Sequence, residues 1–130
     1  MTKTTIFKAG TIALILLGLI HLSAHFGMTP PEDAQSLLDD MNAYTIELMG
    51  SHSLLKFHNG FSVMMGFLLS AFGLILYQLR AAILANRTTL FTVFLLSMIG
   101  FIISFIFFHV LAYGFFLFST LCFSYTFFKK

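Results

Sequence analysis

Three apolar runs constrain the fold of this chain, because each is longer than the core elements of a small soluble domain. The first covers about residues 9–26 and the second about residues 54–79. The third tract, residues 88–128, is roughly twice the ~20 residues that cross a bilayer core, so we expect two helices joined by a tight turn. His109, Tyr113 and Gly114 interrupt this tract and place the turn near residues 108–114.

Composition agrees with a membrane protein, since 58% of the 130 residues are hydrophobic and only 9% are charged. No linker, repeat or soluble module divides the chain, which predicts one domain over residues 1–130. We therefore predict an all-α polytopic membrane protein, a four-helix bundle with transmembrane helices over about residues 9–26, 54–79, 88–107 and 111–128.

The basic residues gather on one side of these four helices. With the N-terminus in the cytoplasm, every Lys and Arg except Lys56 falls on the inner side, as the positive-inside rule prefers. The inner set is Lys3, Lys8, Arg80, Arg87, Lys129 and Lys130. We expect a multi-pass protein of the bacterial inner membrane with both termini in the cytoplasm.

The connection between the first two helices is itself predicted to be helical, over about residues 30–49. Thr29, Pro30 and Glu32 are typical of a helix start, with threonine as N-cap and glutamate completing a capping box. Apolar residues recur along the segment at helical spacing while its carboxylates take another face, which describes an amphipathic helix along the outer interface. Gly50 then ends this helix, and Ser51 can cap the next one.

Small residues mark the faces on which the helices pack. Transmembrane helices associate through small side chains that allow close approach, and three of the four predicted helices carry such a stripe. The residues are Gly10 and Gly18 in the first helix, Ser62, Gly66, Ser70 and Gly73 in the second, and Ser97, Gly100 and Ser104 in the third.

Histidines provide the chemistry, and all five fall on the predicted outer side. His21 and His25 are separated by four residues, so their imidazoles project side by side from the first helix. His58 stands at the outer end of the small-residue stripe of the second helix, and His109 returns to the same side through the turn between the last two helices. His21, His25 and His58 are the predicted cofactor ligands, and His109 joins them as a predicted metal ligand. We interpret His52 as an interfacial residue.

Several chemistries fit these imidazoles. Neutral histidine binds zinc, copper and iron, and facing helices can hold haem through axial histidines. A proton relay or a quinone-type contact is a further option, because histidine titrates near neutral pH. The competing interpretation is structural, with the imidazoles hydrogen-bonded to serines, backbone carbonyls, headgroups or water.

Other classes of function find no support in the sequence. The dispersed cations of a chain with net charge +2 do not build a nucleic-acid footprint, and the single Cys122 allows no intrachain disulfide and no paired-cysteine metal motif. No glycine-flanked serine and no phosphate-binding glycine loop occur.

The segment Gly18–Phe26 with its His21 and His25, followed by Met49 and Gly50 at the entry to the second helix, resembles small uncharacterised four-helix membrane proteins of bacteria. The resemblance carries no known activity and therefore implies no catalytic or binding residue.

The sequence thus favours a non-enzymatic accessory or binding subunit of a membrane assembly. Its expected partners are the lipid bilayer and other membrane proteins or further copies of the chain. The alternative is a haem- or metal-binding redox protein that uses the outer histidines.

Overall fold

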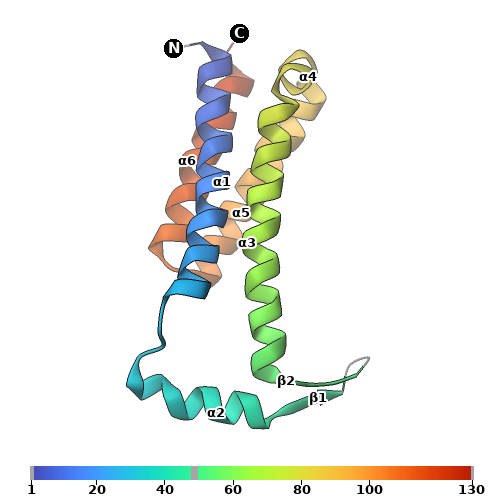
Figure 1. The fold of residues 1–130 in the computed structure, drawn as a ribbon. Helices are drawn as coiled ribbons and strands as arrows, with labels where there is room; N and C mark the ends of the chain where they lie inside the picture. The colour runs from blue at the N-terminus through green and yellow to red at the C-terminus, as the bar shows by residue number, and fades with distance from the viewer. Residues whose placement is uncertain (1, 48–49, 130) are drawn as a thin grey trace.

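Four long helices dominate the computed structural model, which describes residues 2–47 and 50–129 (Figure 1). They are α1 (Lys3–Gly27), α3 (Leu54–Gln78), α5 (Arg87–Phe107) and α6 (Val110–Phe128). Each is long and apolar enough to cross a membrane, which is typical of a membrane protein and confirms the predicted set of four. The break between α5 and α6 falls at Phe108 and His109, inside the predicted turn.

Side chains before three of these helices satisfy their first backbone N–H groups. The hydroxyl of Thr2 accepts from Thr5 N at 3.2 Å, and Asn86 Oδ1 accepts from the backbone of residues 88 and 89. Ser53 caps α3, accepting from Lys56 N at 3.3 Å, so the prediction that Ser51 caps this helix is wrong. Between α3 and α5 the chain forms a short helix, α4 (Arg80–Ala85), which the predicted helices do not include.

Helix α1 lies at the centre of the packing, with α3 on one side and α6 on the other, and α5 packs on α6. The small residues of α3 form a packing face, as predicted, and the helix they pack against is α1. A Cβ at Gly66 would lie 2.7 Å from Leu22, and one at Gly73 would lie 2.9 Å from the Thr11 carbonyl oxygen. These contacts hold the α1 and α3 backbones unusually close.

The second packing face of α1 meets α6. A Cβ at Gly10 would lie 2.9 Å from the side chains of both Cys122 and Phe123. In the predicted α1 stripe, Gly10 therefore packs against α6, whereas Gly18 packs against α3. Helix α5 meets α6 through Gly100, whose added Cβ would reach a Phe116 ring carbon at 2.5 Å. The stripe predicted for α5 is therefore a packing face.

The cluster of buried apolar residues lies toward the end of the bundle where the termini and α4 are found (Figure 1). Phe7, Leu14 and Phe123 are fully buried there, and the rings of Phe7 and Phe123 have centroids 5.1 Å apart. Leu76, Ile83, Leu90 and Val93 complete this core. No such cluster of buried residues forms at the opposite end among the described residues, which leaves room there between the helices.

The connection between α1 and α3 differs from the single helix predicted over about residues 30–49. It contains a turn of 3₁₀-helix, η1 (Glu32–Ala34), the helix α2 (Gln35–Ala43), and a hairpin of β1 (Thr45–Glu47) with β2 (Ser51–Ser53). The two strands are antiparallel, with Ile46 opposite His52. Helix α2 lies beyond the ends of α1, α5 and α6, roughly crosswise to the start of α3, and contacts α3 (Figure 1).

Local backbone preferences explain this difference. The predicted capping box does not form, because η1 begins after Pro31 without a side-chain cap and α2 begins after Ala34. The β-branched Thr45 and Ile46 favour a strand, and Gly50 adopts a φ of 137°, which glycine tolerates in a tight connection. Gly50 therefore sits in the hairpin connection rather than ending a helix. Met49, the other half of the Met–Gly junction, lies outside the described residues.

Candidate functional site

His21 lies at the α1–α3 interface and bonds to α3. Its Nε2 is 3.0 Å from the backbone carbonyl oxygen of Ser62 and 3.0 Å from the Ser62 hydroxyl. The nitrogen can donate to the carbonyl, or accept from the hydroxyl in the other tautomer. This contact follows from the close approach of Gly18 and Gly66, since His21 is three residues after one and Ser62 four residues before the other.

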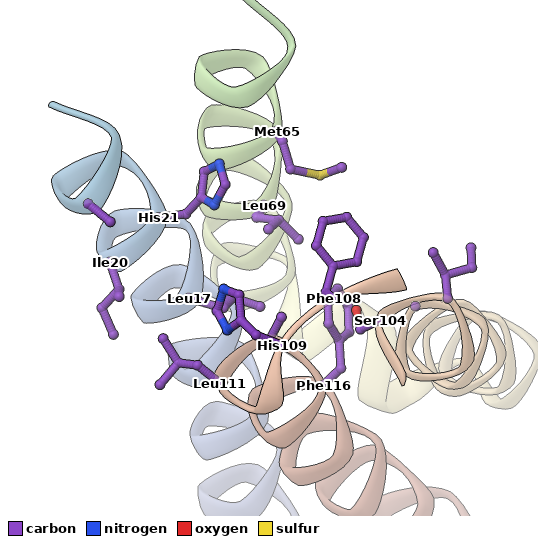
Figure 2. A pocket seen from close by; sticks show the side chains of 14 residues that line it. Leu17, Ile20, His21, Met65, Leu69, Ser104, Phe108, His109, Leu111 and Phe116 are labelled. Carbon is purple, nitrogen blue, oxygen red and sulfur yellow. The ribbon is translucent and has the colours of Figure 1, made fainter. Parts of the chain in front are cut away.

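A cavity of about 440 Å³ opens beside His21, and all four long helices contribute to its wall. Figure 2 shows His21 on α1 and His109 at the junction of α5 and α6, with Met65 and Leu69 reaching in from α3. The wall is almost wholly apolar, and its polar side chains are those of His21, Ser104 and His109. It is completed by Leu17, Ile20, Ala24, Gly100, Ile103, Phe108, Leu111, Ala112 and Phe116.

His109 is placed by the break between α5 and α6. Phe108 and His109 both have extended backbone, which ends α5 and turns the chain into α6. The His109 carbonyl accepts from Ala112 N at 3.0 Å at the start of α6. Its side chain is exposed and lines the cavity, so two imidazoles from segments far apart in the sequence border one space.

The other predicted ligands do not reach this cavity. His25 is half-buried and packs edge-on against Phe26, with ring centroids 4.9 Å apart. His58 is exposed on α3 and does not line the cavity. His52, in β2, borders a separate shallow groove with Lys56 and Phe57. The structure thus brings together His21 and His109 and leaves His25 and His58 apart from them.

The arrangement sets a limit on metal binding. Across residues 2–47 and 50–129, no group of three or more His, Cys, Asp or Glu side chains is close enough to hold a metal ion. The two imidazoles on the cavity can still supply two nitrogen ligands to a metal ion. They can alternatively form hydrogen bonds with an organic ligand.

Two features of the site were not found from the sequence. Ser62 was predicted to be a packing residue only, although it also hydrogen-bonds to His21. Its position four residues before Gly66 places it on the same face of the helix, and this spacing could have indicated the contact. The aromatic wall of Phe108 and Phe116 was not identified, because nothing distinguishes these two among 18 phenylalanines.

Comparison of the chain with protein-family models, with curated protein sequences and with solved structures finds no match in any of the three.

Proposed function

We propose that this chain is a non-enzymatic membrane protein, an accessory or binding subunit, that binds a lipophilic ligand in the cavity beside His21. The observation that carries the proposal is the cavity itself. Its volume of about 440 Å³ falls within the range of about 300–1,000 Å³ usual for small-molecule sites, and its apolar wall with a few polar groups is also usual for them.

The side chains of the wall support one chemical class of ligand. Apolar side chains on all four helices suit a hydrophobic body, and the imidazoles of His21 and His109 suit one or two hydrogen-bonding groups such as a carbonyl or hydroxyl. A quinone-like molecule has this chemistry. Such a ligand dissolves in the bilayer, so it reaches the cavity sideways from the lipid.

The proposal includes insertion of the four helices into a bacterial inner membrane. Large apolar side chains are exposed along them, for example Phe67 at 62%, Phe105 at 64% and Leu121 at 59%, and lipid would cover such surface. The basic residues of α1, α4 and α5 lie at the end that carries the termini, which supports a cytoplasmic position for that end.

In the same proposed topology, α2 lies at the outer interface. Leu38 and Met41 are half-buried, whereas Asp39 and Asp40 are exposed to solvent. Leu37 on the same helix is apolar and 60% exposed, so α2 carries apolar and acidic side chains that a membrane surface would separate, which supports an interfacial position.

The test is identification of molecules that remain bound after purification in a mild detergent. We expect an organic extract of the wild-type protein to contain one amphiphilic species in near-stoichiometric amount. Ala112→Phe, which places a ring in the cavity, should lose that species, and Ala82→Phe, at an exposed position of α4, should keep it. Equal retention by both variants would refute the cavity as the binding site.

Haem or metal binding is the second candidate, and the position of His21 and His109 on one cavity is the observation in its favour. Purified protein should then show a Soret band or stoichiometric transition metal, and His21→Ala should remove it. A colourless protein without metal, purified under conditions that retain haem in a control cytochrome, would exclude this candidate.

A further inference from the structure

At the opposite end of the bundle from the cavity, two cations from different helices share one aromatic ring. The Lys8 ammonium lies 5.7 Å from the centroid of the Tyr77 ring, and the Arg80 guanidinium carbon lies 5.0 Å from it. Arg80 Nη1 also donates to the Tyr77 carbonyl at 2.8 Å, which fixes the guanidinium beside the ring. Lys8 from α1 and Arg80 from α4 thus both contact the ring of Tyr77 on α3.

No Asp or Glu side chain balances this pair of charges. All five acidic residues of the chain fall within residues 32–47, in the connection at the other end of the bundle. Two cations on one ring without a neighbouring carboxylate attract an anion, and a bound anion lowers the electrostatic energy of both. The guanidinium fork and the ammonium are the donors that proteins use for phosphate.

We propose that Lys8, Tyr77 and Arg80 bind the phosphate headgroup of an anionic phospholipid such as phosphatidylglycerol. Basic pockets between transmembrane helices bind such headgroups. A lipid is favoured over free phosphate because the next helical turns carry exposed apolar side chains, Ile12 at 44% and Leu74 at 48%, on which acyl chains can lie. Lys8 and Arg80 are both half-buried, so their stems follow the helix surface while their charges reach the headgroup.

The experiment is a titration by native mass spectrometry of the full chain in neutral detergent. Phosphatidylglycerol and phosphatidylcholine with the same acyl chains are the two probes. Each basic side chain near a membrane surface contributes about fivefold to the affinity for anionic lipid, so Lys8→Gln should weaken phosphatidylglycerol binding about fivefold and the double variant with Arg80→Gln about 25-fold. Binding of phosphatidylcholine should not change.

Lys56→Gln is the matched control, because it removes one exposed lysine from the opposite end of the bundle. It should leave phosphatidylglycerol affinity within twofold of wild type. Equal losses for Lys8→Gln and Lys56→Gln would overturn the site, since they would show only a general effect of charge. Binding of phosphatidylglycerol by the double variant at wild-type affinity would overturn it too.

A competition arm separates the two sources of phosphate. Inorganic phosphate at millimolar concentration should not displace phosphatidylglycerol from the wild-type protein. Displacement would assign the site to a soluble phosphate and contradict the lipid proposal. If the double variant does not purify as a folded protein, the comparison of the single variants Lys8→Gln and Lys56→Gln decides the result.

Discussion

The contact between Gly18 and α3 gives the sharpest prediction about the fold. A Cβ at Gly18 would lie 2.5 Å from the Gly66 carbonyl oxygen and 2.6 Å from the Ser70 backbone nitrogen. These are backbone atoms, which cannot rotate away as a flexible side chain can. Gly18→Ala must therefore push α1 and α3 apart or distort one of them.

The magnitude follows from two opposing effects. Alanine in a helix is favoured over glycine by about 0.5–1 kcal/mol. Overpacking costs about 1–3 kcal/mol, and contact with backbone atoms places Gly18 near the upper end. We expect Gly18→Ala to lower the free energy of unfolding by about 1–2 kcal/mol. Gly60→Ala, in α3 with nothing within 4 Å of its added Cβ, should raise it by about 0.5–1 kcal/mol.

The assay is reversible unfolding in mixed micelles, followed by far-ultraviolet circular dichroism as the denaturing detergent fraction increases. Gly18→Ala should be less stable than wild type and Gly60→Ala more stable, so the two variants should differ by about 1.5–3 kcal/mol. Equal stabilities for Gly18→Ala and Gly60→Ala would refute the close approach of α1 and α3. The close approach of α1 and α3 positions His21 against Ser62. Equal stabilities would therefore also contradict the described geometry of the cavity.

Three further predictions test separate parts of the structure. Ser62→Ala removes one of the two oxygens bonded to His21 Nε2 and should cost about 0.6 kcal/mol in the same unfolding assay, whereas an unchanged stability would contradict the contact. Thr120→Val removes the buried partner of Ser97, whose hydroxyl is 2.9 Å away, and should cost about 1 kcal/mol, with the exposed Thr92→Val near neutral as its control. Equal costs for the two threonine variants would be evidence against a buried α5–α6 hydrogen bond. After the last residue, a fused reporter that works only in the cytoplasm should be active, and one that works only outside the membrane should be inactive. Activity of the external reporter would overturn the proposed orientation.

The long helices could be predicted from the sequence because their signal is strong and local. Apolar runs of sufficient length define α1, α3, α5 and α6 within a few residues, except that α1 begins at Lys3 rather than near residue 9. The small residues of α3 are likewise informative, since close backbone approach requires glycine at Gly66 and Gly73.

The connection and the site could not be predicted to the same extent. The hairpin depends on three-residue strands, which leave almost no periodic pattern, and its main signals were the β-branched Thr45 and Ile46. Convergence of His21 with His109 depends on how α1, α5 and α6 are arranged in three dimensions, and helical spacing along one chain segment does not report that. Spacing favoured His25 as the partner of His21, but the cavity is bordered by His109 instead.

Photocrosslinking in intact membranes tests the proposed ligand cavity most directly. A photoreactive amino acid replaces Leu69, which lines the cavity, or in a second protein Leu68, which is 53% exposed on the outer surface of α3. We predict that position 69 yields one discrete non-phospholipid adduct by mass spectrometry, whereas position 68 yields the mixture of bulk phospholipids. The same phospholipid mixture at both positions would contradict a dedicated binding cavity.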